Sequence, residues 1–188
     1  MKTMIISSSP NKIGLTNSCV DICIKTLQDL NVETKWIVLN QYNIRKCEAC
    51  GKRGWGICLE EHICRMEDDF NKLQEEMGEY DNFIIVSPVY FYEMSESAKT
   101  FFDRLKRCQS FNENSKLKGK EMLCVACAGG SGDGTENTLH SMKNLAKFLH
   151  TEVVDYIGIT KKNFENEKER IAESTKKLLQ IQNNTTIS

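Results

Sequence analysis

The hydrophobic pattern of the chain changes period in a regular order, and this order constrains the fold more than any other feature. Short apolar runs that suit strands alternate with segments in which apolar residues recur at helical spacing. The predicted strands are 3–7, 35–39, 83–87, 121–128 and 153–159. The predicted helices are 16–30, 68–77, 95–107, 139–149 and 163–182. This alternation indicates an α/β protein whose sheet is mostly parallel, with helices on both faces.

The length and the charge balance set further limits. A chain of 188 residues is the size of one domain, and we expect a single domain over 1–182 with a cysteine-rich insertion at 47–66 and a frayed tail at 183–188. The 25 basic and 26 acidic residues give a net charge of −1, which argues against nucleic acid or an anionic membrane surface as a partner. No apolar run approaches the roughly 20 residues that a membrane span needs.

Cysteine is unusually frequent, with nine residues in the chain. Met4–Ile6 is too short an apolar run for a signal peptide, so we expect a reduced, cytoplasmic protein. Cys124 and Cys127 have the spacing of a chelating pair, but an odd offset within a strand sends them to opposite faces of the sheet. We expect these two, together with Cys19 and Cys23, to be packing residues. Cys108 is predicted to end a helix as a free thiol.

In a parallel α/β sheet, ligands bind beyond the carboxyl ends of the strands, so the loops there are candidate sites. The first loop leads into a helix N-terminus, which favours phosphate. Its hydroxyl and amide side chains would add hydrogen-bond donors: Ser7, Ser9, Thr16, Asn17 and Ser18. The loop has neither a Walker A nor a dinucleotide glycine pattern, and a simple turn with a helix cap would also explain it.

Two further loops at the same predicted edge suit a ligand. Residues 87–95 carry Tyr90, Phe91 and Tyr92, which need a packing partner such as a planar ring system or a second subunit. Residues 129–134 contain four glycines, which expose backbone amides and allow close approach of a ligand. The alternative for the glycine-rich loop is a flexible turn.

The motifs of these three loops resemble those of the NADPH-dependent FMN reductases. The sequence reads Ser-Pro-x3-Gly-x-Thr at 9–16 and Ser-Pro-Val-Tyr-Phe at 87–91, followed by Phe-Phe-Asp-Arg at 101–104 and the glycine-rich loop. The similarity extends to about Ile159 and is greatest to the iron–sulfur flavoprotein branch. It implies a flavodoxin-like three-layer sandwich with strand order 2-1-3-4-5 and FMN at the strand ends.

The resemblance also implies roles for individual residues. The FMN phosphate would be held by Ser9, Asn11, Thr16, Asn17 and Ser18. The ribityl chain and the isoalloxazine ring would contact Pro88, Val89, Tyr90 and Phe91, with Gly129, Gly130 and Gly134 along the other side of the ring. Relatives usually carry an arginine directly after the first-loop proline, where this chain has Asn11. That difference weakens the phosphate site electrostatically unless Lys12 compensates.

The cysteine-rich insertion has a donor set suited to metal. Its four thiols, Cys47, Cys50, Cys58 and Cys64, are the right number for a [4Fe–4S] cluster or an all-cysteine zinc site. Iron–sulfur flavoproteins carry Cys-x2-Cys-x2-Cys and a fourth cysteine before an Asp-Asp pair. Arg53 stands at the third position here, and Cys58 is the candidate replacement. A cluster, a zinc ion and a loop of reduced thiols without metal are all compatible with this spacing.

We therefore expect an FMN-dependent NAD(P)H oxidoreductase that passes electrons to a small acceptor such as a flavin or a quinone. No catalytic side chain is required, because a bound flavin carries the chemistry. The first alternative is an iron–sulfur flavoprotein that relays electrons, to a protein acceptor for example, without its own nicotinamide site. The second is a flavodoxin-like binding protein that has lost its cofactor. Aromatic residues near the site, Trp55, Phe91 and Tyr92, and the family resemblance favour a homodimer or homotetramer.

Overall fold

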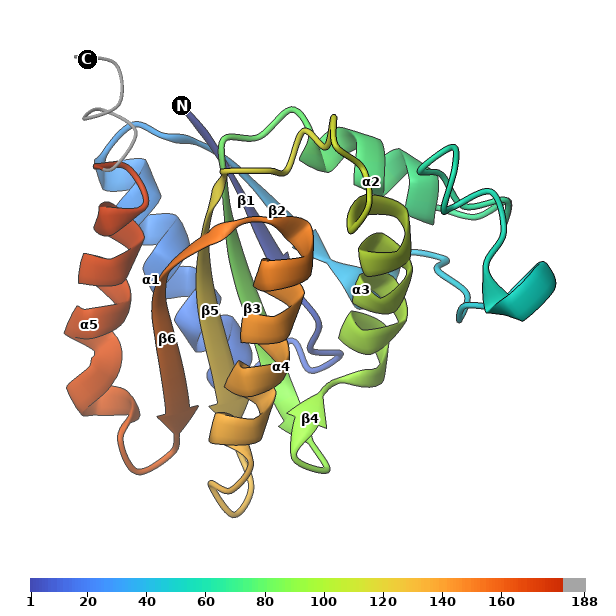
Figure 1. Cartoon of the computed structure of the whole chain (residues 1–188). Helices are drawn as coiled ribbons and strands as arrows, with labels where there is room; N and C mark the ends of the chain where they lie inside the picture. Colours follow the sequence, from blue (N-terminus) through green and yellow to red (C-terminus); the bar gives the residue numbers. More distant parts are fainter. Residues whose placement is uncertain (181–188) are drawn as a thin grey trace.

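The computed structural model describes residues 1–180 and contains one mixed sheet (Figure 1). The strands are β1 (Lys2–Ser7), β2 (Glu33–Val38), β3 (Asn82–Tyr90), β4 (Glu93–Met94), β5 (Glu121–Ala128) and β6 (Glu152–Thr160). Their order is β2-β1-β3-β5-β6, with parallel pairing throughout, and β4 pairs antiparallel with β3. The predicted flavodoxin-like order is confirmed, whereas the two-residue strand β4 was not predicted.

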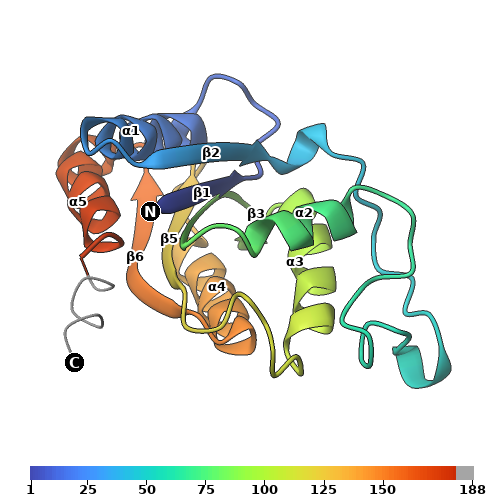
Figure 2. The ribbon, with the colours of Figure 1, turned by 90° about the horizontal axis from the view of Figure 1, so that it is seen from above.

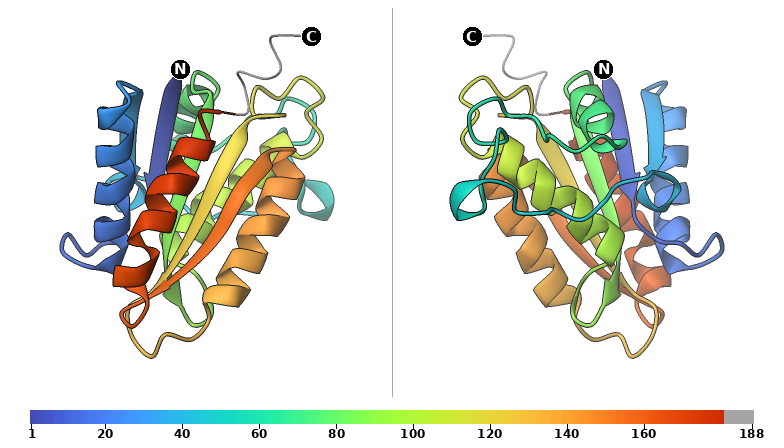
Figure 3. Two further views of the ribbon diagram at one scale, coloured as in Figure 1. Left: turned by 90° about the vertical axis from the view of Figure 1, so that its left-hand side faces the viewer. Right: turned by 90° about the vertical axis from the view of Figure 1, so that its right-hand side faces the viewer.

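The helices form a layer on each face of the sheet, which Figures 2 and 3 show from above and from the sides. On one face lie α1 (Leu15–Asp29) and α5 (Phe164–Lys177). On the other lie α2 (Phe70–Met77), α3 (Glu96–Gln109) and α4 (Thr135–Leu149). The last residues of the predicted C-terminal helix and the predicted tail at 183–188 lie outside the described residues. No helix within residues 1–180 is long and apolar enough to cross a bilayer.

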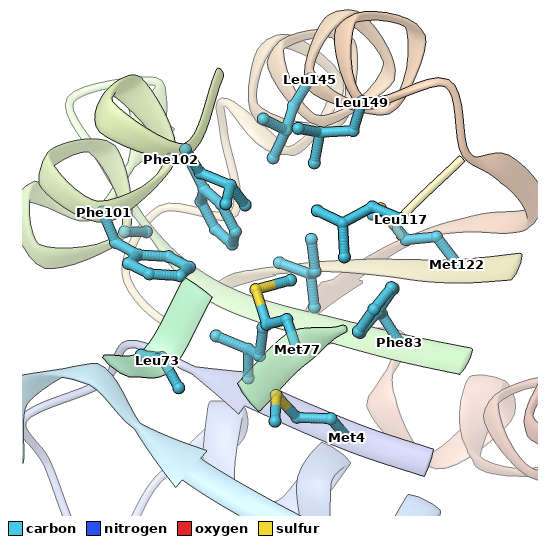
Figure 4. Close-up of a cluster of buried hydrophobic side chains, with 14 of the residues drawn as sticks. Met4, Leu73, Met77, Phe83, Phe101, Phe102, Leu117, Met122, Leu145 and Leu149 are labelled. Atoms are coloured by element: carbon cyan, nitrogen blue, oxygen red, sulfur yellow. The ribbon is translucent and has the colours of Figure 1, made fainter. Parts of the chain in front are cut away.

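Alternating side chains on the strands divide the core in two. Met4 and Ile6 of β1 pack under α2, α3 and α4, whereas Ile5 between them packs under α1 and α5. Figure 4 shows the first cluster, where Phe101 and Phe102 of α3 meet Met77 of α2 above the sheet. The cysteines of β5 follow the same rule, because Cys124 belongs to the first cluster and Cys127 to the second. Their predicted placement on opposite faces is confirmed.

The parallel strands all end at one side of the molecule, the lower side in Figure 1. We call this side the carboxyl edge and define it as residues 8–14, 88–95 and 129–134. The cysteines of the insertion lie elsewhere. The cysteine segment, residues 45–68, leaves the sheet after β2 and lies beside α3 (Figure 1).

Candidate flavin and cysteine sites

The loop after β1 leaves the N-terminus of α1 without a side-chain cap. Gly14 is the N-cap residue in an extended conformation, and it offers no side chain to the first N–H groups of the helix. The loop before it is held by its own turns: Asn11 N–H donates to Ser9 Oγ over 3.3 Å, and Ile13 N–H donates to Asn11 Oδ1 over 3.1 Å. An uncapped helix start carries partial positive charge and unpaired donors, which is the physical basis of a phosphate site.

The predicted phosphate residues lie together in this loop and in the first turn of α1. Ser9 and Thr16 are buried, with 8% and 5% of their surface exposed. Asn17 Nδ2 donates to the carbonyl oxygen of Lys12 over 2.9 Å, and Ser18 Oγ donates to that of Gly14 over 3.2 Å. These two side chains therefore fix the loop to the helix.

The turn between β3 and β4 presents aromatic side chains in an unusual backbone conformation. Phe91 and Tyr92 both have positive φ, +48° and +65°, a left-handed conformation that bulky residues rarely adopt. Phe91 is fully exposed, and Tyr90 and Tyr92 are 43% and 55% exposed. Backbone strain of this kind persists only where the surroundings hold it, and it is often found at binding sites.

The glycine-rich loop packs against this aromatic turn and leaves space beside it. A Cβ on Gly134 would lie 2.7 Å from Tyr92 Cα and 2.9 Å from Val89 Cγ1, so only glycine allows the two loops to approach this closely. A Cβ on Gly129 or Gly130 would meet no atom within 4 Å. The carboxyl edge therefore combines an uncapped helix start, exposed aromatic rings and open glycine backbone.

A serine network that the sequence analysis missed connects the first and third loops. Ser8 Oγ donates to Ser87 Oγ over 3.2 Å, and the backbone N–H of Ser95 also donates to Ser87 Oγ over 3.2 Å. Ser95 Oγ and Ser97 Oγ both donate to the carbonyl oxygen of Ser8, over 3.1 and 3.3 Å. The network ties β1, β3 and α3 together beneath the carboxyl edge. In the sequence, only a serine at the end of each of these two predicted strands indicates the network.

The C-terminal end of the cysteine segment is anchored by a buried ion pair. Arg104 of α3 donates two hydrogen bonds to the carboxylate of Asp68, over 2.7 and 2.9 Å, and both side chains are at most 1% exposed. Burial alone would raise the pKa of Asp68, but hydrogen bonds from Arg104 and from the N–H groups of Arg45 and Phe70 hold it below its usual value. Asp68 is the last residue of the segment and accepts the N–H of Arg45, the first residue. Both ends of the segment are therefore attached to the buried Asp68–Arg104 pair.

Side-chain amides of α2 fix the backbone near Cys64. Asn71 Oδ1 accepts the N–H of Cys64 over 2.9 Å, and Asn71 Nδ2 donates to the Cys64 carbonyl over 2.6 Å. Gln74 Nε2 donates to the carbonyl oxygen of His62 over 2.9 Å. His62 itself has a left-handed φ of +59°. This end of the segment is therefore held rigidly against α2.

All four cysteines of the segment line one small cavity of about 20 Å³. Its wall on α3 is formed by Arg104, Arg107 and Cys108. Burial, together with the nearby thiols of Cys58 and Cys64, raises the pKa of Cys108 to about 12. Within residues 1–180, however, no three Cys, His, Asp or Glu side chains lie close enough together to hold a metal ion. The four thiols therefore line the same cavity but are too far apart to bind a metal ion together.

The cavity is also distant from the carboxyl edge. Helix α3 starts at that edge with its cap residue Ser95 and runs away from it (Figure 1), so Cys108, thirteen residues later, lies about 20 Å along the axis at 1.5 Å per residue. Trp55 is partly buried beside the cavity, where its ring contacts Phe111 and the guanidinium of Arg107, a residue of the cavity wall.

The present arrangement does not fit a four-iron cluster. Within residues 1–180 no three potential ligands converge on one point, and Arg53 stands where the resemblance places a third cysteine. The donor types fit a thiolate-bound metal, but the positions of the thiols and their spacing in the sequence do not fit a preformed [4Fe–4S] site.

The sheet order and the helix layers define a flavodoxin-like protein whose open loops lie together at the carboxyl edge. The chain belongs to the NADPH-dependent FMN reductase family, whose sequence model matches residues 1–164.

Curated relatives agree with this assignment, and a solved structure shares the fold. An iron–sulfur flavoprotein of Archaeoglobus fulgidus is 29% identical over 136 residues, which make up 72% of this chain and 58% of that protein. An iron–sulfur flavoprotein of Methanocaldococcus jannaschii is 29% identical over 155 residues, covering 82% of this chain and 75% of the relative. The NAD(P)H:quinone oxidoreductase from Methanothermobacter marburgensis has the same fold, with a TM-score of 0.66, 14% identity and coverage of 95% and 96%. The chain thus spans less than two thirds of the Archaeoglobus relative's length.

Proposed function

We propose that the protein is an FMN-dependent oxidoreductase that takes electrons from NAD(P)H and passes them to a small acceptor. The observation that carries the proposal is the convergence of three loops on one edge of the sheet: an uncapped helix start, exposed aromatic rings and open glycine backbone. Membership of the FMN reductase family supports FMN as the ligand of that edge.

Each loop would contact a different part of the cofactor. The backbone N–H groups at the start of α1, with Ser9, Asn11 and Thr16, would bind the phosphate. Because Asn11 is neutral, the remaining cation of this loop is the exposed Lys12. The first loop therefore binds the phosphate mainly through backbone dipoles.

The remaining residues would hold the ring. Pro88, Val89 and Tyr90 would contact one side of it, and the backbone of Gly129 and Gly130 would leave room on the other. Bound FMN supplies the hydride and electron chemistry, so this chain has to orient the ring and leave one face open to a second molecule. The exposed aromatic turn at Phe91 and Tyr92 would cover the ring or contact a second subunit, which supports a homodimer or homotetramer.

The proposal is tested by adding FMN to the purified protein and following the quenching of flavin fluorescence. We expect binding with a dissociation constant in the micromolar range or below. The flavin absorbance near 450 nm should then bleach on addition of NADH or NADPH under anaerobic conditions and recover with a quinone. Protein that neither quenches FMN nor retains it on gel filtration would rule the proposal out.

A second candidate is favoured by the relatives, which are iron–sulfur flavoproteins, and by the four cysteines in the sequence of the segment. In that case the protein would be an iron–sulfur flavoprotein that relays electrons without a nicotinamide site of its own. Iron and acid-labile sulfide analysis of anaerobically purified protein separates the two candidates. About four irons per chain and no bleaching by NAD(P)H would favour the relay.

A further inference from the structure

A buried group of serines lies directly beneath the first loop of the carboxyl edge. Ser8, Ser87 and Ser95 are each at most 2% exposed, and they come from the end of β1, from β3 and from the start of α3. Burying a hydroxyl group is costly unless it has a hydrogen-bond partner. The partners of these hydroxyls are one another and the backbone of the two loops above them. The serines are therefore placed to set the positions of those loops.

The carbonyl group of Ser8 attaches the first loop to α3. It accepts a hydrogen bond from Ser95 Oγ over 3.1 Å and another from Ser97 Oγ over 3.3 Å. All peptide bonds within residues 1–180 are trans, and a trans peptide points its carbonyl and the following N–H in opposite directions. The N–H of Ser9 therefore points away from α3. Two hydroxyls of α3 thus fix the direction of a backbone donor in the loop that would bind the phosphate.

The other end of this loop is held by side chains of α1. Asn17 Nδ2 donates to the carbonyl oxygen of Lys12 over 2.9 Å, and Ser18 Oγ donates to that of Gly14 over 3.2 Å. The loop is thus hydrogen-bonded to a different helix at each end. A phosphate site made mainly of backbone N–H groups gains affinity when the backbone is ordered before the ligand arrives, because ordering it on binding costs entropy.

Ser87 joins the same group to the loop that would hold the ring. Its Oγ accepts hydrogen bonds from Ser8 Oγ and from the N–H of Ser95, both over 3.2 Å, and donates to the carbonyl oxygen of Pro88 over 2.9 Å. The position of the phosphate loop is therefore tied to that of the ring loop. A ligand that carries both a phosphate and a ring gains from this fixed arrangement, whereas riboflavin gains from the ring loop alone.

We infer that Ser95, assisted by Ser97, is a positioning residue that makes the carboxyl edge selective for a 5′-phosphorylated flavin over the unphosphorylated one. The inference rests on the proposed function, because it takes FMN as the ligand of the edge. Ser95 is fully buried, and its hydroxyl bonds to the Ser8 carbonyl and to the N–H of Ala98. It therefore acts on the phosphate through the backbone of the first loop and not by direct contact.

The test is a pair of titrations, one with FMN and one with riboflavin, followed by the quenching of flavin fluorescence. We expect wild-type protein to bind FMN at least ~10-fold more tightly than riboflavin, since hydrogen bonds to a charged phosphate are strong. Ser95→Ala should lower the ratio of the two affinities about 10-fold and Ser97→Ala about 3-fold, because each removes a donor to the Ser8 carbonyl. Riboflavin affinity should stay at the wild-type value in both variants.

Ser110→Ala is the matched control. It removes a hydroxyl that donates to the carbonyl oxygen of Lys106 over 2.6 Å, just beyond the C-terminal end of α3, and it should leave the affinity ratio unchanged. Ser95 also caps α3 by accepting the N–H of Ala98, so urea unfolding of each variant checks the fold. Ser97→Ala retains this cap and decides the question where Ser95→Ala does not fold.

Three results would overturn the inference. The first is a wild-type affinity ratio in both Ser95→Ala and Ser97→Ala. The second is an equal loss of FMN and riboflavin affinity in these variants, which would indicate a general structural role. The third is an equal fall of the ratio in Ser110→Ala. Wild-type protein that binds FMN and riboflavin equally well would contradict only this inference, whereas wild-type protein that does not bind FMN would contradict the proposed function as well.

Discussion

The carboxyl edge and the cysteine segment obtain their shapes by different means. The edge is positioned by strand register, in which Ser7 lies opposite Val86 and Pro88 opposite Cys127, so its loops meet wherever their strands end. The cysteine segment has no strand to guide it. It is held by buried side chains, above all by Asp68 and Arg104. The conformation of the carboxyl edge should therefore tolerate most side-chain substitutions, whereas the conformation of the cysteine segment should depend on very few residues.

The largest effect that this difference predicts comes from the buried ion pair. Asp68→Asn leaves the Arg104 guanidinium buried without its counter-charge, and we expect it to lower the free energy of unfolding by about 3–5 kcal/mol. Urea unfolding at pH 7 measures the loss. Because the folded-state pKa of Asp68 lies below its usual 3.8, its contribution is full above pH 3.8 and disappears as the pH falls through the folded-state value.

An exposed ion pair on the same helix provides the control for this prediction. Lys99 Nζ lies 2.6 Å from Asp103 Oδ1, and both side chains are about half exposed. Asp103→Asn should cost less than about 1 kcal/mol, since water screens the pair. Equal losses for Asp68→Asn and Asp103→Asn would show that the segment is not anchored by buried charge.

A smaller effect is expected at the carboxyl edge, from the contact between the glycine-rich loop and the aromatic turn. Gly134→Ala adds a Cβ 2.7 Å from Tyr92 Cα at a φ of +86°. We expect a loss of about 2–3 kcal/mol in unfolding free energy, because backbone has to shift. Gly119→Ala has a similar φ of +75° and no atom within 4 Å of the new Cβ, so it should cost only about 1 kcal/mol. A similar loss in both variants would argue against the close contact.

The smallest effect lies at the opposite edge of the sheet, away from both regions. Glu121 is 3% exposed, and burial, with a further contribution from Glu152, raises the pKa of its carboxyl above 4.5. Ionisation therefore reduces stability as the pH rises above 4.5. Glu121→Gln removes this penalty and should raise the free energy of unfolding slightly at pH 7, with little effect at pH 4. Thermal melts at both pH values check it, and an equal change at both would refute it.

The edge could be predicted from the sequence to a large extent, because local patterns determine strands and strand order determines the edge. The limits of β5 were predicted as 121–128, and the opposite faces of Cys124 and Cys127 followed from the period of a strand. Strand β4 escaped prediction because it has two residues and follows a turn in which Phe91 and Tyr92 adopt left-handed conformations that only glycine or asparagine would have signalled.

The cysteine segment was far less predictable, because its decisive contacts join residues distant in sequence. Asp68 had the pattern of an acidic helix start, yet its partner Arg104 lies 36 residues later on another helix. Cys108 is a free thiol at the end of α3, as predicted, but its burial (1% exposed) and its place in the wall of the cysteine cavity were not. No local signal identifies such pairs.

The central claim is that FMN binds at the carboxyl edge, and one pair of variants tests it most directly. Gly129→Leu fills space that no protein atom occupies, so it should leave urea unfolding unchanged. Lys118→Leu adds the same side chain to an exposed loop at the opposite edge. In FMN titrations followed by flavin fluorescence, we predict at least ~10-fold weaker binding for Gly129→Leu and wild-type binding for Lys118→Leu, since a bulky side chain displaces ligand contacts. Wild-type FMN affinity in Gly129→Leu would contradict the account.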